Sequence, residues 1–137
     1  MERQNLNQLA REIHKTAVEH GWWENPPSFG EVVALCHSEL SEALEEYRNE
    51  NPMEWYECMD YECPCDGETC ASWDHAENKC AYNRRKDKPE GIAVEMADCL
   101  IRILDWAAYA GVDMEGIVRR KMAYNNTRPY RHGGKKL

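Results

Sequence analysis

The sequence has no long apolar run, and no stretch of it approaches the ~18 residues that a membrane-spanning helix needs. Its first residues, MERQNLNQLAREI, are polar and amphipathic, unlike a signal peptide or a membrane anchor. There is no run of β-branched residues, and there is a single Phe among 137 residues. These absences predict a cytoplasmic, all-α protein with one domain over residues 1–137, small enough that oligomerisation is expected.

Basic residues are fewer than acidic ones, 17 against 25, which gives a net charge of −8. This balance makes nucleic acid an improbable partner. The charge is uneven, however, because no acid follows Glu115 while seven basic residues do: Arg119, Arg120, Lys121, Arg128, Arg131, Lys135 and Lys136. The asymmetry fits either a local anion-binding site near the C-terminal end or a solvated basic tail.

Apolar residues recur at helical spacing in four segments, which predict helices over about 4–20, 29–48, 91–110 and 114–126. Gly21 and Gly111 are expected to follow the ends of the first and third helices, and Asp113 to cap the fourth. Residues 53–90 lack this periodicity and hold five of the seven cysteines. We expect them to form a cysteine-rich insertion between the second and third helices.

Acidic residues flank the apolar arcs of the second and third helices. At 100° per residue, Glu39, Glu42 and Glu46 fall within about 60° of one another. Glu95 and Asp98 are spaced i, i+3 on the third helix. If the two helices pack along their apolar arcs, Glu39, Glu42, Glu95 and Asp98 converge and need a cation, for which Mg²⁺ or Mn²⁺ is suited. The alternative is two solvated acidic faces.

No Glu is followed three residues later by a His, which argues against a di-iron carboxylate bundle and favours hard divalent cations.

The pair Glu39-x-x-Glu42 followed by Glu95-x-x-Asp98 resembles the signature of the MazG-like nucleotide pyrophosphohydrolases, in the all-α NTP pyrophosphatase superfamily. The resemblance covers the second to fourth helices and the tail. Ser38 stands where the fuller motif has a Glu, and the gap between the two acidic pairs exceeds the family's usual spacing because it contains the cysteine-rich stretch.

The resemblance implies a four-helix MazG-like bundle assembled as a homodimer or homotetramer. It also implies Mg²⁺-dependent cleavage of a nucleoside triphosphate between the α- and β-phosphates, which gives the monophosphate and pyrophosphate. In that reaction the acid quartet binds metal and a metal-activated water attacks the α-phosphorus. Glu42 or Glu46 is a candidate to orient or deprotonate this water.

Two further groups are candidates for substrate binding. Lys121, Asn125 and Arg128 are spaced i, i+4, i+7, so they form one stripe of cations and an amide that suits a polyphosphate. Similar Lys and Asn positions bind phosphate in members of the family. Trp22 and Trp23 precede the second helix, where they either stack on a nucleotide base or pack against a helix end.

The cysteine-rich stretch predicts a tentative structural Zn²⁺ site at Cys63, Cys65, Cys70 and Cys80, with His75 or Cys58 as substitutes. The spacing differs from the paired C-x-x-C of a zinc ribbon. A reduced loop without metal is the alternative. For the whole chain, the alternative to the enzyme is a non-enzymatic, zinc-stabilised helical interaction module.

Overall fold

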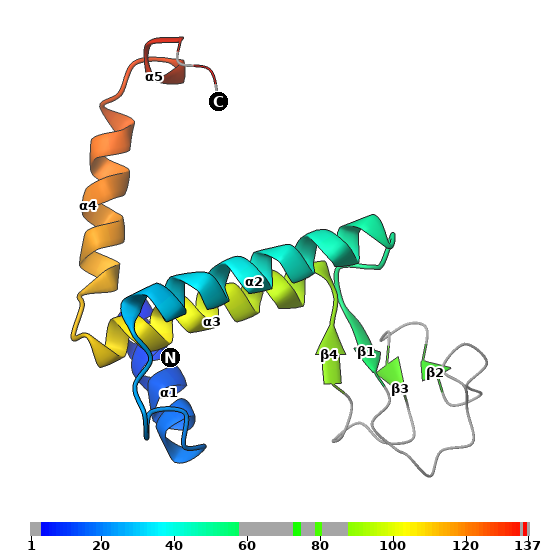
Figure 1. Ribbon diagram of the computed structural model, residues 1–137. Helices are drawn as coiled ribbons and strands as arrows, with labels where there is room; N and C mark the ends of the chain where they lie inside the picture. Colours follow the sequence, from blue (N-terminus) through cyan, green and yellow to red (C-terminus); the bar gives the residue numbers. More distant parts are fainter. Residues whose placement is uncertain (1–3, 58–72, 75–78, 81–87, 135, 137) are drawn as a thin grey trace. The chain divides into compact units, whose positions relative to one another are not determined.

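The computed structural model describes residues 4–57, 73–74, 79–80, 88–134 and 136 (Figure 1). Within these residues the chain is mainly helical, in agreement with the predicted all-α class. The five helices are α1 (Leu6–Glu19), α2 (Phe29–Arg48), α3 (Ile92–Tyr109), α4 (Met114–Asn126) and the short α5 (Arg131–Gly134). The four short strands are β1 (Trp55–Glu57), β2 (Trp73–Asp74), β3 (Lys79–Cys80) and β4 (Lys88–Glu90).

The helix boundaries lie within two residues of those predicted from the sequence, and the predicted cap of α4 and the predicted glycines after α1 and α3 act as expected. The Asn5 side chain accepts a hydrogen bond from the Gln8 backbone N–H (2.8 Å), which fixes the start of α1. Asp113 does the same for the Gly116 N–H at the start of α4 (2.9 Å). Gly21 and Gly111 follow α1 and α3 in the left-handed region, at φ 80° and 67°.

No helix of the described chain is both long enough and apolar enough to cross a bilayer.

The chain forms two compact units, and α3 contributes one part to each. The first unit contains Met1–Ser28 and Ile101–Leu137, and its core is built on Ala10, Leu104 and Ala107. Leu104 is buried almost completely. The small residues around it allow the α1 backbone to approach α3 closely.

A polar and aromatic cluster lies beside this core and has Asp105 at its centre. Its carboxylate accepts hydrogen bonds from the Trp23 indole N–H at 3.0 and 3.1 Å, and it lies 2.6 Å from Nδ1 of His14. Trp23 also stacks on Tyr109, with ring centroids 4.2 Å apart. One half-buried acid therefore ties α1 and the turn after it to the second part of α3.

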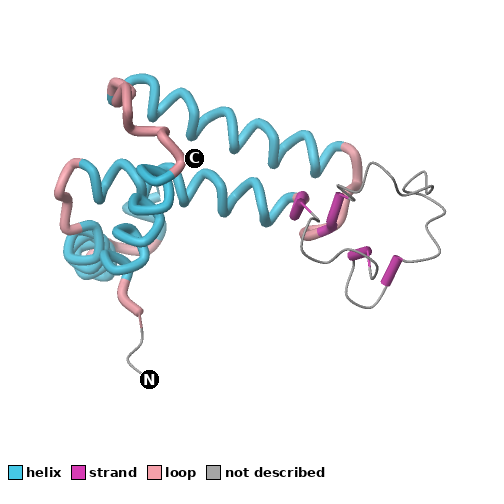
Figure 2. Tube along the Cα trace, turned by 90° about the horizontal axis from the view of Figure 1, so that it is seen from below, coloured by secondary structure: helices cyan, strands magenta, loops and turns pink. Residues whose placement is uncertain are grey.

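The second unit, Phe29–Leu100, contains α2, the four strands and the first part of α3. The two helical segments run side by side in both views (Figures 1 and 2). Val32, Ala43 and Cys99 form the buried apolar contacts of this unit. The core is small, so its large aliphatic side chains are only partly covered.

Short strands stand at both ends of the segment that was predicted to be an insertion. β1 pairs antiparallel with β4, with Trp55 opposite Glu90, and β2 pairs with β3. The sequence does not predict these strands, because two or three residues are too few to show an alternating pattern. The β1–β4 pair joins the two ends of the connection where it leaves α2 and enters α3.

Gly91 marks the point where this connection enters α3. Its φ is +118°, and a Cβ at this position would lie 2.6 Å from the carbonyl oxygen of Met53 and 2.8 Å from that of Pro52. The same Met53 carbonyl accepts the Ala93 backbone N–H at 2.9 Å. Only glycine allows the chain after α2 to approach the start of α3 this closely.

The substitution Gly91→Ala is therefore expected to lower the free energy of unfolding by clearly more than Gly111→Ala. Both glycines have positive φ, and at Gly111 nothing lies within 4 Å of an added Cβ. Gly111→Ala should thus show the backbone penalty of about 1–2 kcal/mol alone. Denaturant unfolding of the two variants measures the difference, and equal losses would show that the close approach at Gly91 is unimportant.

Candidate metal centre

Three carboxylates from α2 and α3 come together in the Phe29–Leu100 unit. Glu39 and Glu42 are one turn apart on α2, and Glu95 lies in the first turn of α3. One oxygen from each of Glu39, Glu42 and Glu95 lies within 4.8 Å of the other two. Oxygens at this spacing can contact a single cation of the size of Mg²⁺ or Mn²⁺.

Two of these carboxylates are buried. The exposed fraction is 6% for Glu39 and 5% for Glu95, whereas Glu42 is exposed. The pKa of Glu95 is raised from 4.5 to about 7, mainly by burial and further by a hydrogen bond with Glu90 and the charges of Glu42, Glu90 and Asp98. A buried acid among other acids favours a proton or a cation, so the donor set fits a hard divalent metal ion.

Asp98 follows Glu95 by one helical turn. It is half-buried, and its charge contributes to the raised pKa of Glu95. Among the described residues, the tight group of three oxygens comprises Glu39, Glu42 and Glu95, and Asp98 lies beside this group. Of the predicted quartet, the structure therefore brings three members together and places the fourth next to them.

Glu90 is an additional acid of the cluster, and the sequence pattern did not predict it. It ends β4, and its side chain forms a hydrogen bond with Glu95 and an ion pair with Lys88. The sequence offered no helical spacing for it, because Glu90 precedes α3. It enters the cluster through the β1–β4 pairing, which is a long-range contact.

Glu46, the further acid predicted on this side of α2, is not in the cluster of three, because its carboxylate binds residues that follow the helix. Glu46 accepts hydrogen bonds from the Trp55 indole N–H at 2.8 Å and from the Asn51 amide at 3.1 Å. Glu46 thus holds the chain that follows α2. Ser38 donates its hydroxyl to Glu42 at 3.3 Å.

The predicted substrate-binding residues belong to the other unit. Lys121 and Asn125 are exposed on α4, and Lys121 lies 5.0 Å from the centroid of the Tyr124 ring. Arg128 follows the end of α4 and is half-buried. Trp22 is 75% exposed, whereas Trp23 takes part in the Asp105 cluster described above.

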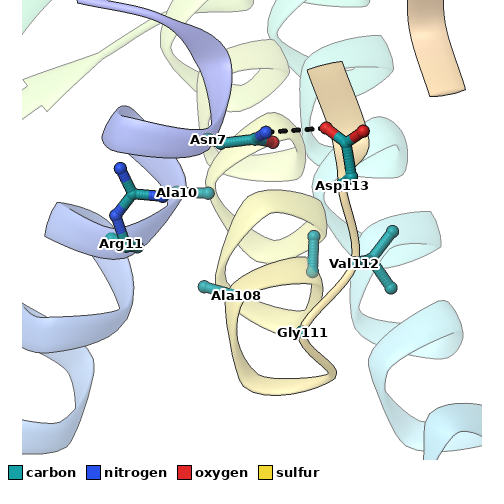
Figure 3. Close-up of a pocket in the computed structure, with 8 residues that line it drawn as sticks. Asn7, Ala10, Arg11, Ala108, Gly111, Val112 and Asp113 are labelled. Atoms are coloured by element: carbon teal, nitrogen blue, oxygen red, sulfur yellow. Dashed lines mark hydrogen bonds between the residues drawn. The ribbon is translucent and has the colours of Figure 1, made fainter. Parts of the chain in front are cut away.

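A hollow of about 270 Å³ lies between α1 and the α3–α4 turn (Figure 3). Its floor is made of small residues, and its polar groups bind one another: the Asn7 amide donates to Asp113 at 2.8 Å and accepts the Glu115 N–H at 3.1 Å. These contacts fix the start of α4. The hollow contains none of the predicted site residues.

The predicted zinc ligands cannot be placed, because the side chains of Cys63, Cys65, Cys70 and Cys80 lie outside the described residues. The same holds for His75 and Cys58. The two cysteines whose side chains are described, Cys36 and Cys99, lie in the helices, where they are half-buried and buried respectively.

In comparisons with known proteins, no family model, no curated protein and no solved structure matches this chain.

The raised pKa of Glu95 predicts how the stability of the metal-free protein changes with pH. The folded state favours the protonated acid, so this contribution to stability is full below pH 4.5 and falls as pH rises to about 7. The loss amounts to at most about 3 kcal/mol by linkage. Glu95→Gln removes this pH dependence. The free energy of unfolding of the variant, relative to that of the wild-type chain, should therefore be higher at pH 8 than at pH 5.

Denaturant unfolding in the presence of a chelator measures this difference. Glu45→Gln is the matched control, because Glu45 is on α2, exposed and bound to Arg48. If Glu95→Gln and wild type differ equally at the two pH values, Glu95 does not titrate as described.

Proposed function

We propose that this protein is a Mg²⁺- or Mn²⁺-dependent nucleoside triphosphate pyrophosphohydrolase of the MazG-like kind, which gives a nucleoside monophosphate and pyrophosphate. The observation that carries the proposal is the cluster of Glu39, Glu42 and Glu95, with two of the three carboxylates buried. The spacing of Glu39-x-x-Glu42 and Glu95-x-x-Asp98, which resembles the family signature, supports it.

The chemistry assigns separate tasks to the acids. Glu39, Glu42 and Glu95 hold the cation, and Asp98 adds negative charge beside them. A divalent cation held there supplies charge neutralisation for the phosphates and a lowered pKa for the attacking water. Glu42 is the exposed member of the group and so the better placed to orient that water, whereas Glu46 is engaged by Trp55 and Asn51.

Substrate binding in this proposal comes from cationic and aromatic side chains. Lys121, Asn125 and Arg128 donate hydrogen bonds to the phosphate oxygens, for which ammonium, amide and guanidinium groups are well suited. Trp22 exposes most of its indole and offers a surface for base stacking. Its neighbour Trp23 instead binds Asp105 and stacks on Tyr109, so Trp23 is not offered to the base. The protein is also proposed to assemble as a homodimer or homotetramer.

Glu95→Gln and Asp98→Asn are each expected to lower turnover by at least about 100-fold while helicity is retained, because each removes a negative charge at the cluster. The assay is release of pyrophosphate from a panel of ribo- and deoxyribonucleoside triphosphates with Mg²⁺. Glu45→Gln, on α2 outside the cluster, should keep wild-type turnover. Turnover retained by both acid variants, or absent from the wild-type chain with every substrate, would refute the proposal.

Lys121→Met is expected to lower kcat/KM by about tenfold or more through the loss of a charge-assisted hydrogen bond to phosphate. Arg119→Met is the matched control on the same helix. Arg119 already binds Glu115 at 2.6 Å, and it lies about 160° around the helix from Lys121. Equal losses in the two variants would indicate a general effect of charge on α4 and not a contact of Lys121 with substrate.

A further inference from the structure

A stripe of large apolar side chains runs along α2. Its members lie within about 60° of one another at 100° per residue. Each has between 37% and 69% of its surface exposed. We call it the α2 stripe, and it comprises Phe29, Val33, Leu40, Leu44 and Tyr47. The buried residues Val32 and Ala43 border the stripe along one edge and mark the side of α2 that packs within its unit.

The stripe is longer and more continuous than the scattered apolar residues of an ordinary surface. It extends from the first to the next-to-last residue of α2, a length of about 27 Å at 1.5 Å per residue. Half-exposed side chains of this size leave on the order of 100 Å² each. The five together therefore expose about 500 Å², which is at the upper end of the largest patch on a typical monomer.

Charge around the stripe indicates what kind of partner fits. All five acids of α2, Glu31, Glu39, Glu42, Glu45 and Glu46, lie at least about 80° away from every member of the stripe. The residues that border the stripe on the side away from Val32 and Ala43 are Gly30, His37, Ser41 and Arg48. A chain with a net charge of −8 would repel its own copy across most surfaces, but not across this one.

The apolar area of two α2 stripes is large enough for a specific interface between two copies of the chain. Two α2 stripes that cover each other bury about 1,000 Å², the lower bound for such interfaces. Met96 and Leu100 of the same unit are about half exposed and provide further apolar surface. A strongly charged partner would need a charged rim to recognise, and the edge of the stripe has no acid and a single Arg.

We infer that the α2 stripe is the surface through which two copies of this chain associate, with their α2 helices antiparallel about a two-fold axis near Leu40. A two-fold axis makes like surfaces meet, and an axis perpendicular to α2 sets the two helices in opposite directions. The middle of the stripe is residue 38, so each Leu40 then lies close to the Leu40 of the other copy. The inference does not use the acid cluster and holds whether or not the chain hydrolyses nucleotides.

Leu40→Lys tests this directly, because it places two like charges near the axis. Light scattering should give twice the chain mass of 16.0 kDa, or a multiple of that, for the wild-type protein. The variant should dissociate at the α2 interface, with a dissociation constant raised by about tenfold or more. Circular dichroism checks that the helices remain.

Leu35→Lys is the matched control. Leu35 is on the same helix, has nearly the same exposed fraction as Leu40 (41% against 43%) and lies about 140° around the helix. It should leave the mass unchanged. A monomeric wild-type chain, or a mass that Leu40→Lys does not alter, would overturn the inference. The latter result would point to another part of the chain, or another protein, as the group that covers the stripe.

Amide hydrogen exchange of the wild-type protein above and below the dissociation constant provides a second measurement that needs no substitution. Protection that depends on concentration should be centred on residues 36–44. Its absence there would also overturn the inference, even if Leu40→Lys failed to fold.

Discussion

The mutual approach of buried carboxylates on α2 and α3 is the constraint around which the Phe29–Leu100 unit is built. Glu39 and Glu95 are almost fully buried, and Glu95 lies beside the negative charges of Glu42, Glu90 and Asp98. Such an arrangement opposes folding unless protons or a cation compensate it. The small apolar core of this unit, built on Val32, Ala43 and Cys99, must therefore hold together helices whose acids repel one another.

Several contacts at one end of the two helices offset this repulsion. The β1–β4 pair and the approach of Gly91 to Met53 join the chain after α2 to the start of α3, and the Trp55–Glu46 hydrogen bond ties β1 back to α2. Each of these contacts lies where the cysteine-rich connection leaves α2 or enters α3. The connection therefore affects the acid cluster, since its last strand places Glu90 against Glu95.

The sequence predicted those features that depend on helical periodicity and capping. The boundaries of α2 and α4, the cap at Asp113 and the glycine after α3 follow from residues close together in the chain. The same spacing brought Glu39 and Glu42 to one side of a helix. The parts that could not be predicted depend on long-range pairing: the β1–β4 ladder, the entry of Glu90, and the bond of Trp23 to Asp105 across 82 residues. No local pattern encodes which segments meet.

The two sides of α2 show how one helix serves two opposed requirements. A carboxylate cluster needs negative charge in a shielded place, whereas self-association needs an apolar surface without like charges. With 3.6 residues per turn, the spacing of Glu39, Glu42 and Glu46 gathers the acids on one side, and that of Phe29, Val33, Leu40, Leu44 and Tyr47 gathers the apolar residues on another. Moving a single Glu of α2 by two positions would place a charge near the stripe. The order of residues in α2 is thus constrained by both sides at once, and so an acidic chain can still pair with its own copy.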